Sequence, residues 1–156
     1  MKLQQDLREF IELLNSHGSE YLVVGGHAVA FHGHPRFTGD IDFLVRGSVD
    51  NAERILRVLR AFGFGDIALT SADFVKRGSV VQLGRPPNRI DLLTSISGVT
   101  FDDAWAGRVA GRLDGVPVFF LGLQALLENK LASGRPKDIA DVAKLRTVAA
   151  SRTKPG

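Results

Sequence analysis

The sequence contains no cysteine, and this absence removes two kinds of chemistry. Without that residue the chain can build neither a disulfide framework nor a site with a thiol nucleophile. The absence is compatible with a reducing compartment. The sequence also lacks a long uninterrupted apolar segment and a charged leader that runs into an apolar stretch. We therefore expect a soluble, cytoplasmic protein with no membrane segment.

Internal repeats and low-complexity tracts are absent as well, which argues against a solenoid or a disordered protein. The 156 residues are 44% hydrophobic and 24% charged, as in an ordinary globular protein with its own core. We expect one domain over residues 1–150 and a disordered tail over 151–156. The net charge of +3 suits an anionic partner such as an NTP or RNA, but small basic proteins often have this balance without such a partner.

Two aspartates interrupt an apolar strand predicted over residues 40–46. Because side chains alternate along a strand, Asp40 and Asp42 share one face while Ile41 and Phe43 share the other. Carboxylates that lie so close repel each other unless a cation lies between them, and Mg²⁺ or Mn²⁺ prefers such oxygen ligands. The alternative is that Asp40 forms a turn after Gly39 and Asp42 faces water on an edge strand.

A pair of glycines, Gly25 and Gly26, lies between an apolar strand predicted over 20–24 and a short helix predicted over 26–33. Backbone N–H groups at such a junction can approach a phosphate closely, although a plain tight turn has the same composition. Arg36 and Thr38 precede the aspartates and offer a cation and a hydroxyl to a polyphosphate.

A third aspartate occurs in a later predicted hairpin, whose strands cover residues 79–83 and 89–94. Asp91 interrupts the second strand as Asp40 and Asp42 interrupt theirs, which favours a metal ligand; the alternative is a surface ion pair with Arg89. A further strand is predicted over 115–121, and Pro117 indicates that it lies at an edge of the sheet.

Helices are predicted near both ends of the chain. The first covers 2–16, and two more follow residue 121. The apolar face of the penultimate helix includes Leu131, and that of the last helix includes Ile139. Lys130 lies at the margin of its helix's buried face, where it either extends its amine to water or reaches into a site.

The segment GGHAVAFHGHPRFTGDIDFLV, residues 25–45, resembles the signature of the DNA polymerase β-like nucleotidyltransferase superfamily. Within it, RFTGDIDFLV is similar to the AbiEii-type nucleotidyltransferase toxins. The resemblance implies an α/β (α+β) fold, in which helices flank a small mixed sheet and two helices end the chain. The C-terminal motif of these proteins, in which a helix lysine and a following Lys/Arg-Asp pair border the active site, is also similar to the combination of Lys130, Arg135, Lys137, Asp138 and Asp141.

This resemblance implies a metal-dependent enzyme that moves an NMP from an NTP, such as ATP, to a hydroxyl acceptor. The acceptor would be RNA such as tRNA, a protein or a small molecule, and the chain could act in a toxin–antitoxin pair, with an antitoxin partner or as a homodimer. The implied catalytic and metal-binding residues, with Mg²⁺ or Mn²⁺, are Asp40, Asp42 and Asp91. The implied nucleotide-binding residues are Gly25, Gly26, Arg36, Thr38 and Lys130. The alternative is a non-catalytic nucleotide-binding or regulatory module of the same fold.

Overall fold

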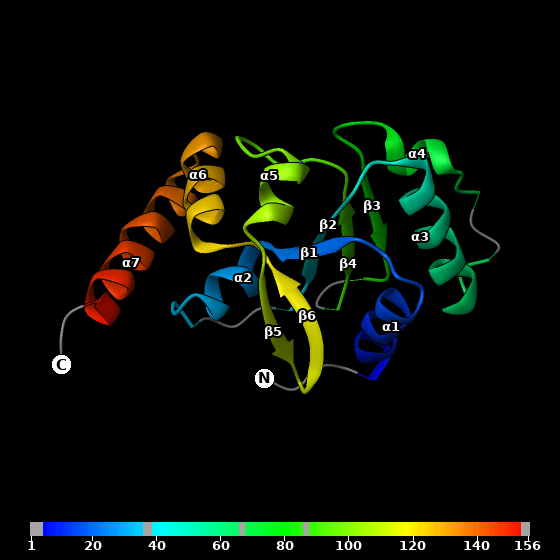
Figure 1. Ribbon diagram of the computed structural model, residues 1–156, viewed down its shortest axis with the longest axis horizontal. Helices are drawn as coiled ribbons and strands as arrows, with labels where there is room; N and C mark the ends of the chain where they lie inside the picture. Colours follow the sequence, from blue (N-terminus) through cyan, green and yellow to red (C-terminus); the bar gives the residue numbers. More distant parts are fainter. Residues whose placement is uncertain (1–4, 36–38, 66–67, 86–87, 154–156) are drawn as a thin grey trace.

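A six-stranded mixed sheet runs through the middle of the computed structural model, which describes residues 5–35, 39–65, 68–85 and 88–153 (Figure 1). The strands are β1 (Tyr21–Val24), β2 (Ile41–Val45), β3 (Val80–Leu83), β4 (Ile90–Leu93), β5 (Val109–Leu113) and β6 (Val116–Phe120). Their spatial order is β3-β4-β2-β1-β6-β5. β2 runs parallel to β4 and β1 parallel to β6, while the other neighbours are antiparallel.

Helices flank this sheet, as the sequence predicts. They are α1 (Gln5–Ser16), α2 (Gly25–Phe31), α3 (Val49–Ala61), α4 (Ser71–Val75), α5 (Phe101–Ala106), α6 (Leu123–Ser133) and α7 (Pro136–Thr153). Figure 1 shows α6 and α7 at one end of the molecule and α3 and α4 at the other. None of the described helices is long and apolar enough to span a bilayer.

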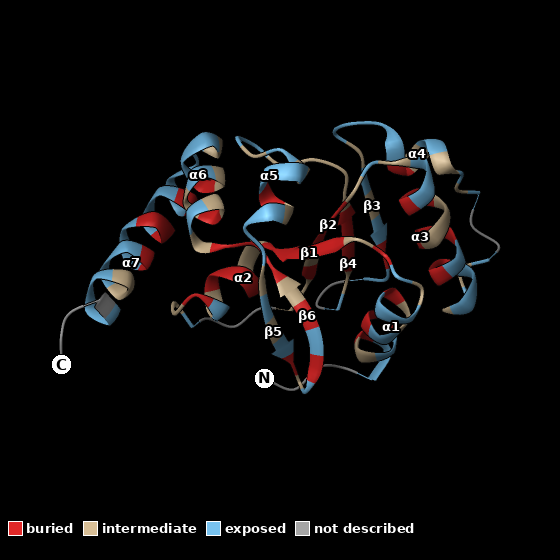
Figure 2. Ribbon diagram, in the orientation of Figure 1, coloured by how far each residue is buried: buried red, intermediate tan, exposed pale blue. Residues whose placement is uncertain are grey.

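The central strands are buried on both faces, whereas the edge strands are not (Figure 2). Every residue of β1 is buried, and β2 and β4 each have a single residue that is only partly buried. Exposed and less exposed residues alternate instead along β3 and along most of β5. Near-continuous apolar runs are expected for strands with covered faces, so the composition of each strand matches its place in the sheet.

The two faces of β2 carry side chains of different kinds. Phe43 points to the side covered by α1, where its ring centre lies 6.0 Å from that of Phe10. Full burial of such a side chain contributes roughly 1.5–3 kcal/mol to stability. Because side chains alternate along a strand, Asp42 and Leu44 point to the opposite face. One face of the strand therefore belongs to the core, and the other can carry polar groups.

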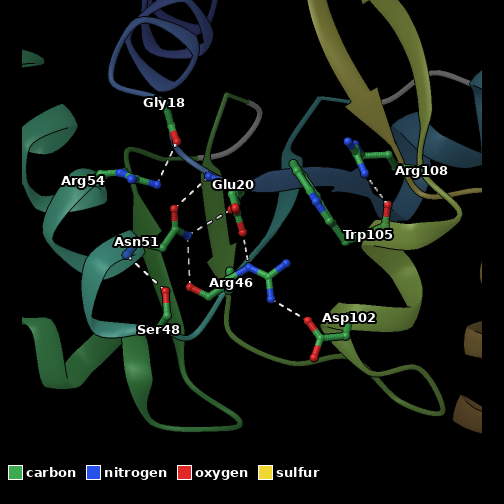
Figure 3. A network of polar contacts seen from close by, with 9 residues as sticks. All are labelled: Gly18, Glu20, Arg46, Ser48, Asn51, Arg54, Asp102, Trp105 and Arg108. Atoms are coloured by element: carbon green, nitrogen blue, oxygen red, sulfur yellow. Dashed lines mark hydrogen bonds and ion pairs between the residues drawn. The ribbon is translucent and has the colours of Figure 1, made fainter.

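Asn51 fastens α3 to the start of β1 and the end of β2 (Figure 3). Its side-chain oxygen accepts a hydrogen bond from the N–H of Glu20 at 2.7 Å. Its amide nitrogen donates to the carbonyl oxygens of Glu20 and Arg46, both at 3.0 Å. Figure 3 also shows Arg46 between the carboxylates of Glu20 and Asp102, which ties α5 to the same corner of the sheet.

Three features differ from the sequence-based expectations. β6 lies between β1 and β5, so the prediction of an edge strand at Pro117 is wrong. β6 pairs with β1 at Phe120, opposite Val23, and Pro117 lies three residues before this pair. The carbonyl of Pro117 accepts a hydrogen bond from Asn15 of α1. β5 itself, the true edge strand, was not expected.

At the C-terminal end, α7 continues to Thr153, so the tail does not begin at Ser151. Alanines at 149 and 150 favour the longer helix.

Candidate active site

The sheet brings Asp42 and Asp91 together. β2 and β4 run parallel, and their register pairs Asp42 with Asp91 directly across the ladder. Side chains at paired positions point to the same face of a sheet. Asp91 is only 7% exposed, and Asp42 is partly buried. Two of the three predicted carboxylates therefore share one small volume, although they are 49 positions apart in the sequence.

Gly25 is required beside this pair for two reasons. Its φ angle is +67°, a left-handed conformation that residues with a Cβ adopt at a cost. A Cβ at this position would also collide with the carboxylate of Asp42. The register explains the proximity, because Val24, the last residue of β1, pairs with Asp42. The absence of a Cβ at Gly25 therefore makes room for the carboxylate of Asp42 at the end of β1.

Asp40 lies one residue before β2, and it is oriented by Arg89. Its Oδ1 accepts a hydrogen bond from the backbone N–H of Arg89 at 2.9 Å, and its Oδ2 lies 3.6 Å from the guanidinium of Arg89. The same guanidinium donates two hydrogen bonds to Asp91, at 2.8 and 3.1 Å. Asp91 thus forms an ion pair with Arg89 at a buried position, and its predicted role as a metal ligand stays a prediction.

The pair of carboxylates perturbs the proton affinity of Asp42. Loss of hydration on burial, followed by the hydrogen bond and negative charge of Asp91, raises the pKa of Asp42 to about 6, against the opposing effect of Arg89. The ionised form of Asp42 is therefore destabilised in the folded protein, and a bound cation would stabilise it. Strongly perturbed carboxyl groups in a cleft are common at functional sites.

The donor chemistry fits a hard divalent cation, because carboxylate oxygens are the ligands that Mg²⁺ and Mn²⁺ prefer. The arrangement fits less completely. Among the described residues, no group of three or more His, Asp or Glu side chains is placed to hold a metal ion. Asp42 and Asp91 therefore form the central donor pair, and Asp40 would have to turn away from Arg89 to join them.

Asp42 and Gly25 open into a cavity of about 590 Å³ between the sheet and the two C-terminal helices. Lys130 also lines this cavity, so three predicted site residues from distant segments meet there. Gly26, Asp40 and Asp91 are not among its lining residues. Arg36 and Thr38 lie outside the described residues, so their predicted contacts with phosphate stay predictions. The sequence-based reasoning missed several polar lining residues, which are Arg77, Ser95, Ser97, Asn129 and Ser133.

Lys130 is bound by carboxylates of the last helix. Its amine lies 3.0 Å from Asp138 and 2.9 Å from Asp141, and its side chain is 9% exposed. Burial alone would raise the pKa of Asp138, but hydrogen bonds from Ser133, Lys130 and Arg135 outweigh it and lower that pKa to about 2. The positive charge of Lys130 is already balanced by these two carboxylates where the lysine lines the cavity. This pairing argues against its predicted role as a phosphate ligand.

His27, next to Gly26, is 3% exposed. Burial lowers the pKa of this ring, and the backbone of Asp40 acts in the opposite direction. A neutral imidazole is therefore favoured close to the acidic residues, and its burial leaves it outside the cavity lining.

Residues 2–150 match a protein family described as "Nucleotidyltransferase of unknown function (DUF6036)". No curated protein matches the chain. The fold is similar to the crystal structure of a protein from Thermotoga maritima that is provisionally described as a nucleotidyltransferase. The TM-score is 0.60, the sequence identity is 18%, and 90% of each chain is covered. At this identity the likeness shows the fold, and it confirms the fold that the sequence predicts.

Proposed function

The chain belongs to this family of nucleotidyltransferases, and we propose that it moves an NMP from an NTP to a hydroxyl acceptor with the help of a divalent cation. One observation supports the proposal more than any other. Asp42 and Asp91 lie side by side on β2 and β4, and Gly25 beside them makes room for the Asp42 carboxylate. Asp42 also opens into a cavity large enough for a nucleotide.

The residues would share the work as follows. Oxygens of Asp42 and Asp91 would hold Mg²⁺ or Mn²⁺, with Asp40 as a further ligand once it leaves Arg89. Such an ion neutralises charge on the triphosphate and orients it. The backbone at Gly25 would approach the phosphates, with Gly26 supporting the turn. Arg36 and Thr38 precede the acidic strand and would add contacts to phosphate.

The reaction is an in-line displacement at the α-phosphorus. The acceptor hydroxyl oxygen forms a bond to that phosphorus, the bond to the bridging oxygen breaks, and pyrophosphate leaves. The hydroxyl proton passes to a carboxylate. Asp42 is the carboxylate placed for this role, because it lines the cavity whereas Asp91 is not among the lining residues.

The test is transfer of label from each α-³²P-labelled NTP, with Mg²⁺ or Mn²⁺ and a bacterial lysate as the source of acceptor. We expect wild type to label a product and Asp42→Asn to lose at least about 100-fold in rate, as is typical when a group that acts in the transition state is removed. Asp50→Asn is the matched control, since Asp50 is exposed in the first turn of α3. Equal labelling by Asp42→Asn and wild type would contradict the proposed site.

One observation favours the alternative of a non-catalytic nucleotide-binding module. Arg89 already donates two hydrogen bonds to Asp91, so that carboxylate can be stable without a metal ion. In that case the protein would bind an NTP by titration calorimetry but label no product in any lysate. Labelling by the wild type excludes this alternative.

The identity of the labelled product would show whether the acceptor is RNA such as tRNA, a protein or a small hydroxyl compound. An AbiEii-type toxin activity is a finer proposal that rests on the similarity of residues 36–45 to such toxins. It predicts that expression of this chain alone slows bacterial growth, and that co-expression of a neighbouring gene, or loss of Asp42, restores growth. Growth that is unaffected by the wild-type chain would contradict it.

A further inference from the structure

The cavity beside Asp42 has three cationic side chains among its described lining residues, and two of them are already neutralised. Lys130 lies between Asp138 and Asp141, and Arg135 lies 2.8 Å from Asp138. These two cations and two carboxylates have no net charge together. An anionic ligand would gain little from them, because attraction by the cations is opposed by repulsion from the carboxylates.

Arg77 is the third cation, and its situation is different. It is exposed at the cavity wall, in the loop between α4 and β3. No ion pair with a carboxylate is recorded for it within the described ranges. Its positive charge is therefore available to a ligand in the cavity.

Hydrogen bonds fix the backbone on both sides of Arg77. The carbonyl of Lys76 accepts from the hydroxyl of Thr94 at 2.6 Å, and the N–H of Gly78 donates to the hydroxyl of Ser95 at 3.0 Å. The N–H of Ser79 donates to the same threonine at 2.9 Å. Such anchoring lowers the entropy that the loop would lose when a ligand binds.

The anchoring residues also connect Arg77 to the acidic pair. Thr94 and Ser95 directly follow β4, the strand that carries Asp91. Ser95 and Ser97 also line the cavity, so hydroxyl groups are found in the same lining as Arg77. The lining thus combines a cation without an ion pair and hydrogen-bond donors, and the loop of Arg77 is anchored to the residues that follow the strand of Asp91.

We infer that Arg77 binds the β- and γ-phosphates of the NTP, and that Lys130 serves the packing of α6 and α7 instead. The inference rests on the proposed function and names the side chain that would orient the leaving group. A guanidinium is suited to this task because it donates two parallel hydrogen bonds to phosphate oxygens. Pyrophosphate and the backbone phosphates of an RNA acceptor share this chemistry, so the test must separate them.

The test is calorimetric titration of the full-length protein with Mg²⁺ and, in separate experiments, each NTP, each NMP, inorganic tripolyphosphate and a short RNA. For Arg77→Gln we expect NTP and tripolyphosphate to bind about 10- to 100-fold more weakly, the loss typical of a hydrogen bond to a charged group. NMP binding should change less than about threefold, and Arg77→Lys should recover part of the affinity. Arg57→Gln, an exposed position on α3, is the matched control and should bind like wild type.

The outcomes separate this inference from the proposed function. If wild type binds an NTP and Arg77→Gln binds it equally well, the assignment of Arg77 is wrong and the proposed function stands. If Arg77→Gln weakens RNA and leaves NTP and tripolyphosphate unchanged, the residue binds the acceptor and the assignment is again wrong. If wild type binds tripolyphosphate through Arg77 but no NTP, the anion site is supported and the proposed function is contradicted. If wild type binds none of them, both fail.

Discussion

Asp42 combines a chemical role with an energetic cost. An ionised carboxylate beside a second one is costly when both are partly removed from water, and the raised pKa of Asp42 measures that cost. A functional group held in this way destabilises the fold that positions it. Stability and activity should therefore respond in opposite directions when its charge is removed.

We predict that Asp42→Asn raises the free energy of unfolding at pH 7 by about 1–3 kcal/mol, the equivalent of a shift from 3.8 to about 6 discounted for partial exposure. The sign follows from linkage. A carboxyl whose folded pKa is raised destabilises the folded state as pH rises through the window between about 4 and 6. The stability difference between variant and wild type should thus be near zero below pH 4 and constant above pH 6.

Urea denaturation at several pH values measures this difference, with Asp50→Asn as the control, because it is the same change at an exposed position. A variant that is less stable than wild type at pH 7, or a difference independent of pH, would show that burial and the charge of Asp91 do not destabilise the ionised form of Asp42.

Gly25 offers a matched comparison with Gly18. Their φ angles are +67° and +68°, but a Cβ at Gly18 meets nothing within 4 Å, whereas one at Gly25 collides with Asp42. We predict that Gly18→Ala costs about 1–2 kcal/mol from backbone strain alone. Gly25→Ala should cost about 2–4 kcal/mol, because overpacking adds to that strain, and it should abolish transfer by displacing the carboxylate. Thermal denaturation and the labelling reaction measure the two effects. Similar losses in both variants would mean that the space beside Asp42 is not needed.

At the scale of elements, the pair α6 and α7 shows what helical periodicity cannot predict. Leu131 and Ile139 were expected on the buried faces of these helices, but they are 44% and 43% exposed. Polar residues point inward instead, with Lys130 from α6 meeting Asp138 and Asp141 from α7. Asp138 and Asp141 lie at helical spacing with the buried Val142 and Leu145, so the sequence shows that the four side chains share one face of α7. It does not show that the two carboxylates on this face are buried against a lysine of α6. A buried ion pair becomes recognisable only when both helices are in place.

We predict that Lys130→Met lowers the free energy of unfolding by about 3–5 kcal/mol, because it removes the cation that two buried carboxylates, Asp138 and Asp141, share. Lys137→Met is the matched control on α7, where the lysine is exposed, and should stay within about 0.5 kcal/mol of wild type. Urea denaturation at pH 7 is the measurement. If Lys130→Met keeps wild-type stability and loses affinity for NTP, this lysine is a phosphate ligand and not a packing group.

At the scale of the whole molecule, the candidate site is assembled from segments that are far apart in the sequence. Asp42 and Asp91 stand out in the sequence because a carboxylate within an apolar strand is a local anomaly, and Asp40 lies just before the first of these strands. The register that pairs Asp42 with Asp91 could not be predicted, since it depends on the order of strands in the sheet. Nothing in the residues around Arg77 distinguishes it from the other arginines of the sequence. Its place at the cavity follows only from the folded position of its loop.

The sheet also determines how the molecule should unfold. Asp42 lies on one side of β1, while the chain's only tryptophan lies on the other, with its ring centre 5.5 Å from that of Phe119 on β6. β1 joins the two sides, through its ladder with β2 and through a hydrogen bond from the N–H of Leu121 to the carbonyl of Val23. Because β1 is buried along its whole length, unfolding of β1 would expose the core on both sides of the sheet.

We predict one cooperative transition, in which Trp105 fluorescence and far-UV circular dichroism give the same urea midpoint. Asp42→Asn should raise both midpoints equally, although Asp42 and Trp105 lie on opposite sides of β1. Asp50→Asn should move neither. If the fluorescence midpoint stays at the wild-type value while the dichroism midpoint rises, the hairpin of β5 and β6 unfolds separately, and β1 does not couple the two sides of the sheet.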